Sequence, residues 1–75
     1  MAYNQEFSFE IKQNLGTLSA NERTAWTREL NLVSFNGAPP KYDIRDWSPD
    51  HSKMGKGVSL TQEEALTLRD LLSKI

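Results

Sequence analysis

Polar and apolar residues alternate along much of the chain, which is the pattern of β-strands with one buried face. The alternation is clearest in residues 7–12, 26–36 and 41–47. Gly16 allows a bend through which the first strand continues toward Leu18, and residues 58–60 indicate a short fourth strand. The polar residues 19–24 fit either a loop or a short helical turn.

Turn and helix signals separate these strands and follow them. Residues 36–40 (NGAPP) predict a hairpin turn, because glycine accepts positive φ and proline donates no ladder hydrogen bond. Residues 51–57 predict a flexible cationic loop. Thr61 and Glu64 form a capping box that predicts a helix start. Behind it, apolar residues recur at helical spacing: Ala65, Leu68, Leu71, Leu72 and Ile75. The pattern predicts an α+β fold of four strands and one helix.

Chain length and composition narrow the function classes. With 75 residues the chain forms one domain, residues 1–75, whose core is thin, so a homodimer is expected. The absence of cysteine excludes disulfides, thiolate zinc sites and a cysteine nucleophile. No apolar run approaches membrane-spanning length and no signal peptide is recognisable. We therefore expect a cytoplasmic protein, nucleoid association included, that needs no metal, cofactor, membrane or small-molecule substrate.

The charge distribution places any anion site in the middle of the chain. The formal net charge is −1. Residues 23–56, however, hold six basic side chains against four acidic ones. Lys41, Arg45 and Trp47 share one side of the third strand at steps of about 6.6 Å per two residues, a spacing that resembles successive nucleotides. Aromatic faces that stack bases and cations that follow phosphates bind single strands, whereas duplex DNA hides its base faces.

A structural interpretation of the same residues is equally open. Trp26, Phe35 and Trp47 fit the core of a small domain, and Lys41 and Arg45 fit cross-strand pairs with acidic neighbours. The alternation pattern alone does not decide between these interpretations.

Three spaced motifs resemble the positive-cofactor-four family, a transcriptional coactivator family whose members bind single-stranded DNA. The motifs are residues 32–37 (LVSFNG), 41–47 (KYDIRDW) and 53–60 (KMGKGVSL), followed by the capped helix. The sequence is most similar to the bacterial YdbC-like branch, and the resemblance runs from Trp26 to the C-terminus. It implies a curved four-stranded antiparallel sheet with one C-terminal helix, dimerisation through helices and sheet edges, and single-stranded DNA along the concave strand surface.

The resemblance also implies roles for individual residues. Phe35 and Trp47 match family aromatics that stack on bases, and Arg28, Arg45 and Lys56 match basic residues that face the strand. Gly57 matches a loop glycine that lets the backbone approach nucleic acid closely. The expected nucleic-acid site comprises Trp26, Arg28, Phe35, Asn36, Lys41, Arg45, Trp47, Lys53, Lys56 and Gly57. The expected dimer interface comprises Leu68, Leu71, Leu72 and Ile75.

The chain departs from the coactivator at Trp26, where the coactivator has a basic residue, and at Asn36, Ala38 and Pro39, where it is lysine-rich. Fewer phosphate contacts are therefore expected, with Trp26 compensating by stacking. The function expected is non-enzymatic binding of single-stranded DNA, and of RNA as a second ligand, with little sequence preference and a role in transcription regulation or DNA maintenance.

Two other function classes compete with this expectation. An enzyme would draw on Asp43, Asp46, Asp50 and His51, but the two strand aspartates should point to opposite faces and no nucleophile motif is present. A protein-binding adaptor would use the same aromatic and basic sheet face as a hot spot. Composition does not separate an adaptor from a nucleic-acid platform.

Overall fold

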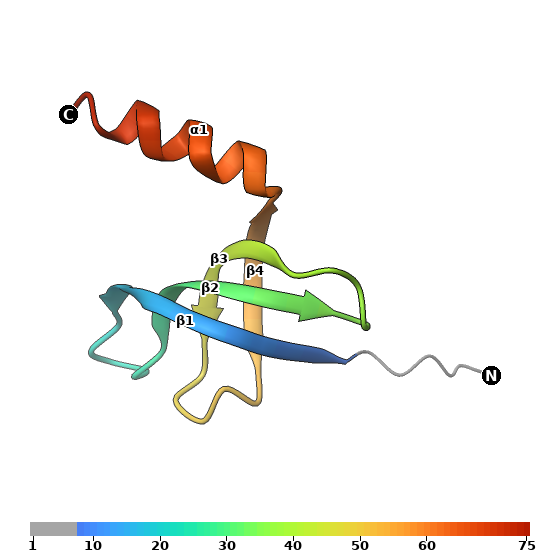
Figure 1. Cartoon of the computed structure of the whole chain (residues 1–75). Coiled ribbons are helices and arrows are strands. Elements are labelled where there is room, and N and C mark those ends of the chain that lie inside the picture. The colour runs from blue at the N-terminus through green and yellow to red at the C-terminus, as the bar shows by residue number, and fades with distance from the viewer. Residues whose placement is uncertain (1–7) are drawn as a thin grey trace.

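The computed structural model describes residues 8–75 and contains one antiparallel sheet and one helix (Figure 1). The strands are β1 (Phe9–Ala20), β2 (Thr27–Phe35), β3 (Lys41–Trp47) and β4 (Met54–Leu60), paired in the order β1-β2-β3-β4. Helix α1 (Gln62–Leu72) follows directly. The predicted fold class of four antiparallel strands and a C-terminal helix is confirmed.

The sequence signals predicted most of the strand and helix ends correctly, with two exceptions. Thr61 and Glu64 form the predicted capping box, and Asn36 and Gly37 adopt positive φ in the β2–β3 turn. β1 continues to Ala20, and a turn at residues 22–24 follows it instead of a helix. The predicted loop at 51–57 is wrong in extent, because β4 already begins at Met54. Residue 7 of the predicted first strand lies outside the described residues.

The sheet curls strongly, and contacts between its corners show it. Phe9 pairs with Phe35 at one end of β2, and Trp47 pairs with Thr27 at the other end. These β2 partners are eight residues apart, about 26 Å along a straight strand. The Phe9 and Trp47 rings nevertheless lie 5.1 Å apart, so the start of β1 folds over the end of β3. Three register shifts along the β1–β2 pairing supply the bend.

The curl creates an inner and an outer face of opposite character. The inner face carries Glu29, Asn31, Val33, Asp43 and Trp47, all of them buried. The outer face carries aliphatic and aromatic residues that remain partly accessible, namely Leu30, Leu32, Tyr42, Ile44, Val58 and Leu60. Three polar residues are therefore enclosed beside the core residues Val33 and Trp47, while a broad apolar surface is left open on the outer face.

Helix α1 leaves the end of β4 and stands apart from most of the sheet (Figure 1). None of its residues is buried, although it carries the predicted apolar stripe. Within residues 8–75, no helix has the length and apolar character needed to cross a membrane.

Candidate nucleic-acid interface

A stacked aromatic and guanidinium pair lies on the inner face. The Arg45 guanidinium carbon sits 5.0 Å from the centre of the half-buried Phe35 ring. Asp43 holds the same guanidinium in a fork, with Nε to Oδ1 at 2.7 Å and Nη2 to Oδ2 at 2.8 Å. Ser59 donates a further hydrogen bond to the buried Asp43 carboxylate. The charge of Arg45 is therefore largely compensated, and its plane is fixed over Phe35.

Gly57 makes this position of Arg45 possible. It pairs with Arg45 across the β3–β4 ladder. A Cβ atom at residue 57 would clash with the Arg45 Cβ, and would lie 2.5 Å from the Ile44 carbonyl oxygen and 2.9 Å from Arg45 Nε. The expectation that the missing side chain of Gly57 lets the protein backbone approach nucleic acid closely stays a prediction. In this structure, Arg45 itself occupies the space.

Trp47 is not the free stacking surface predicted from the sequence. Its side chain is fully buried, with Phe9 at 5.1 Å and the His51 ring stacked at 5.5 Å and an interplanar angle of 29°. The cause is the curl of the sheet, which brings β1 over the inner face at this corner. Among the described residues, no acceptor bonds the buried indole Nε1. Trp47 is thus a core residue of the single chain.

A buried carboxylate that the sequence analysis did not single out organises the same corner. Glu29 accepts hydrogen bonds from the Thr27 hydroxyl at 2.5 Å and the Asn31 amide at 3.1 Å. His51 Nε2 lies 3.1 and 3.0 Å from its two oxygens. Burial raises the pKa of Glu29, but these hydrogen bonds outweigh it and hold the pKa below its usual value. An ionised carboxylate only accepts hydrogen bonds, so His51 carries its proton on Nε2.

The loop that presents His51 is closed by its own hydrogen bonds. The Lys53 amide donates to the Ser48 hydroxyl at 3.0 Å, and the His51 amide donates to the Ser48 carbonyl at 2.9 Å. Asp50 accepts from the amide and hydroxyl of Ser52, at 3.0 and 2.7 Å, and from the Ser48 hydroxyl. These bonds lower the pKa of Asp50 to about 2. Residues 48–53 therefore form a hydrogen-bonded loop, which overlaps the predicted loop at residues 51–57.

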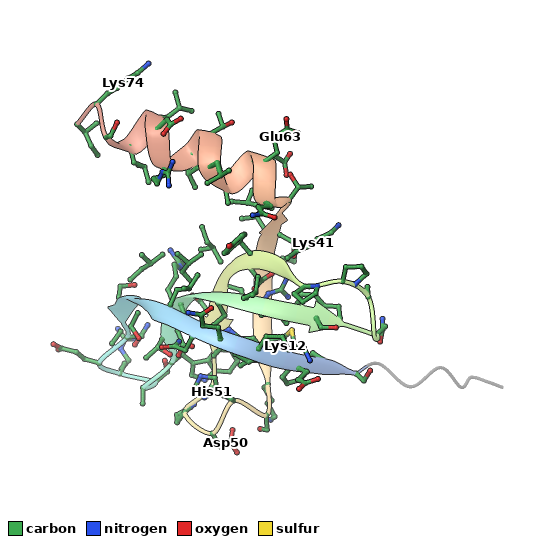
Figure 2. All side chains as sticks on the ribbon, in the orientation of Figure 1. Lys12, Lys41, Asp50, His51, Glu63 and Lys74 are labelled. Atoms are coloured by element: carbon green, nitrogen blue, oxygen red, sulfur yellow. The ribbon has the colours of Figure 1, made fainter. Side chains whose placement is uncertain are left out.

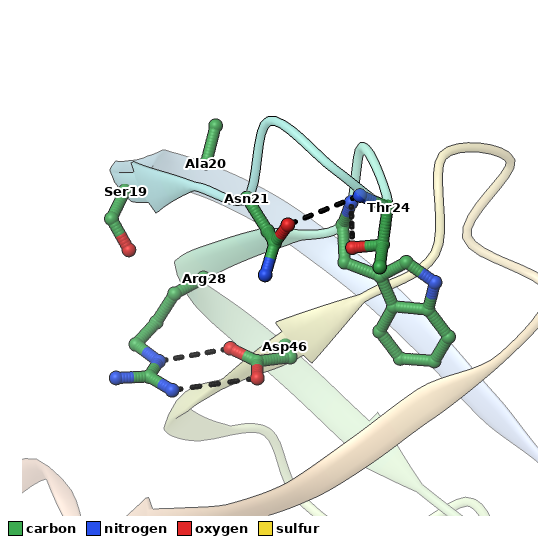
Figure 3. Close-up of a pocket in the computed structure, with 7 residues that line it drawn as sticks. Ser19, Ala20, Asn21, Thr24, Arg28 and Asp46 are labelled. Carbon is green, nitrogen blue, oxygen red and sulfur yellow. Dashed lines mark hydrogen bonds and ion pairs between the residues drawn. The ribbon is translucent and has the colours of Figure 1, made fainter.

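Trp26 and Arg28 belong to the other side of the sheet. Arg28 donates from Nε to Asp46 Oδ1 at 2.9 Å and from Nη2 to Oδ2 at 3.4 Å (Figure 3). This bond raises the pKa of Arg28 and lowers that of Asp46. Trp26 and Arg28 line a polar pocket with Asp46 and the β1–β2 turn. The predicted nucleic-acid site residues are therefore divided between two faces, because the strand positions of Trp26 and Arg28 alternate with those of the inner face that carries Phe35.

The remaining basic side chains of the predicted site are exposed to solvent. Lys41, Lys53 and Lys56 are exposed, and none of them forms an ion pair with another residue in the range 8–75. Lys41 lies at the start of β3 (Figure 2), and Lys53 lies in the β3–β4 loop, directly before β4. The side chain of Asn36 has a structural partner, because it accepts a hydrogen bond from the Ser8 amide at 2.9 Å. The positive charges of the three lysines are therefore not compensated by an ion pair within residues 8–75.

Comparison with known proteins adds a family to this geometry. Residues 23–71 match the family described as Transcriptional Coactivator p15 (PC4). The chain belongs to this family. A protein of Treponema pallidum (strain Nichols), described as an uncharacterized protein, is 54% identical over 72 residues, which cover 96% of this chain and 84% of that protein. The matched PC4 region includes β2, β3 and β4 but not β1, so Phe9, which covers Trp47, lies outside it.

The four residues considered as catalytic candidates do not lie together in one site of this PC4 family member. Asp43 bonds Arg45 on the inner face, Asp46 bonds Arg28 on the outer face, and Asp50 bonds its own loop. His51 instead meets Glu29, which is 22 residues away in sequence. From the sequence alone, Glu29 could be recognised only as an acidic residue in the middle of a predicted strand, near Asn31.

Proposed function

We propose that this PC4 family member binds single-stranded DNA, and RNA as a second ligand, with little sequence preference and without catalysis. The observation that carries the proposal is the Arg45–Phe35 stack on the inner face, at 5.0 Å. Flat aromatic and guanidinium surfaces receive unpaired bases, at about 1 to 3 kcal/mol for each base on an aromatic ring. The family supports nucleic-acid binding in general and a role in transcription regulation.

Phosphates would be met by the exposed lysines. Arg45 and Arg28 are already paired with Asp43 and Asp46, so they add little net positive charge. Each phosphate contact contributes about 0.7 to the slope of log affinity against log salt for single strands. Lys41, Lys53 and Lys56 together predict a slope of about −2 for each bound chain, which is shallow for a nucleic-acid-binding protein.

The outer apolar surface supports a homodimer as the working unit. A groove of about 500 Å³ between the sheet and α1 is lined mainly by Leu15, Leu18, Leu30, Ile44, Leu68 and Leu72. Leu18 is 60% exposed and Leu72 53% exposed. A chain this small gains much from covering such a surface with a second copy of itself. The predicted interface residues Leu68, Leu71, Leu72 and Ile75 are all accessible in the single chain.

Oligonucleotide titration of Phe35→Ala and of the wild type tests the proposal. Loss of one stacking surface predicts binding to oligo-thymidine about 5- to 150-fold weaker. Lys74→Ala, at the C-terminal end of the chain (Figure 2), serves as the control with unchanged binding. Wild-type affinity in Phe35→Ala would remove the Arg45–Phe35 stack from the proposal. Equal wild-type affinity for a duplex of the same length would contradict a stacking mechanism altogether.

A further inference from the structure

We propose that His51 is a base-stacking residue of the inner face and that the buried Trp47 ring supports it from below. The inference rests on the proposed function and names a contact for the bound strand that the sequence did not indicate. It replaces the direct role predicted for Trp47 with a two-layer arrangement, in which only the outer ring meets nucleic acid.

The geometry fixes the His51 ring on one face and one edge. One face stacks on Trp47 with ring centres 5.5 Å apart. The Nε2 edge meets both oxygens of the Glu29 carboxylate. The side chain of His51 is still 40% exposed, whereas that of Glu29 is 6% exposed and Trp47 is fully buried. The imidazole is therefore the part of this cluster that solvent, and a base, can reach.

The ring is also held rigidly, which favours binding. Glu29 is itself fixed by Thr27 and Asn31, with Asn14 at 3.4 Å. A side chain ordered before the ligand arrives loses little further conformational entropy on binding. A freely rotating surface histidine lacks this advantage.

The backbone conformation of His51 independently supports a binding role for its side chain. Its φ is 60°, a left-handed conformation that is strained for residues other than glycine. The hydrogen bonds of Ser48, Asp50 and Ser52 close the loop around it. A glycine would adopt this conformation without strain, but it would provide no ring. Strained backbone that presents a preorganised side chain is typical of binding sites.

The surroundings suit a single strand. Lys53 lies two residues after His51 in the same loop, is exposed, and forms no ion pair with residues 8–75. An aromatic ring beside a free cation is the combination that receives a base and its phosphate. The partner class is therefore an unpaired nucleotide, and not an acidic peptide, which would gain nothing from the ring.

Two variants test the assignment by titration with oligo-thymidine. His51→Gly removes the ring and suits the backbone, and His51→Phe keeps a flat ring without the bond to Glu29. Stacking predicts that His51→Gly binds about 5- to 150-fold more weakly and that His51→Phe binds within about threefold of the wild type. Lys74→Ala, at the far end of the chain (Figure 2), is the control with unchanged binding. Wild-type or tighter binding by His51→Gly would overturn the proposal and make His51 a mere cover of Trp47. Equal weakening in both variants would overturn stacking in favour of a hydrogen bond.

The unmodified protein provides a second readout that does not depend on variant folding. His51 is the only histidine, so its ring protons are assigned directly in an NMR spectrum. Saturation with oligo-deoxyadenosine should move them upfield through the purine ring current, and unchanged shifts in the bound state would refute the contact. Absence of single-strand binding by the wild type would defeat the proposed function itself. Binding by the wild type with unchanged His51 signals would defeat only the His51 assignment.

Discussion

Replacing Gly57 by alanine tests how the sheet positions Arg45. The new Cβ would lie 2.5 Å from the Ile44 carbonyl and 2.9 Å from Arg45 Nε, so backbone or side chain must shift. Overpacking of this kind costs about 1 to 3 kcal/mol. Each kcal/mol lowers the melting temperature of a domain this small by about 4 to 8 °C.

Gly55→Ala is the matched control in the same strand. Its nearest neighbour would be the Asp46 Cβ at 3.5 Å, an ordinary contact. Removing a glycine also restricts the unfolded chain, so Gly55→Ala should be neutral or stabilising by up to about 1 kcal/mol. Urea denaturation of both variants at one protein concentration measures the difference. Equal midpoints for the two variants would refute the close contact between Arg45 and residue 57.

Three further outcomes follow from the structure. Leu72→Asp should make the chain monomeric in a mass measurement, whereas Lys74→Ala, with the same change in net charge, should leave it dimeric; a dimeric Leu72→Asp would contradict the helix interface. Trp47→Ala should lower the free energy of unfolding by about 3 to 5 kcal/mol, as for a buried core ring, and a change below about 1 kcal/mol would contradict its burial. The depressed pKa of Asp50 means that its contribution to loop stability is complete above the ordinary pKa of 3.8 and is lost as pH falls through about 2. NMR titration of the Asp50 carboxyl carbon checks this, and a midpoint near 3.8 would contradict the hydrogen bonds from Ser48 and Ser52.

Local sequence signals were sufficient for the elements of this fold. Period-two alternation identified the strands, and Thr61 with Glu64 identified the helix start, because both depend on neighbouring residues alone. The extent of β4 was missed because the two glycines at 55 and 57 are typical of a loop. In the structure, Gly55 lies beside Asp46, and Gly57 makes room for Arg45.

The burial of the candidate site depends on longer-range geometry. The pattern put Trp47 and Arg45 on one strand face correctly, but whether that face is open depends on the curl of the sheet. The curl arises from three register shifts in β1, and the sequence marked only the one at Gly16, as a bend. The pairing of His51 with Glu29 joins a loop to a strand 22 residues away, so neither residue signals the other. The resemblance located the three motifs but did not include Phe9, the residue that closes over Trp47.

The affinity for oligo-thymidine, compared with a duplex of equal length over a range of salt concentrations, tests the central claim most directly. We expect the single strand to bind at least tenfold more tightly, with a slope of log affinity against log salt of about −2 for each bound chain. Equal affinity for the two forms, or no binding to either, would contradict the claim that this sheet receives unpaired bases.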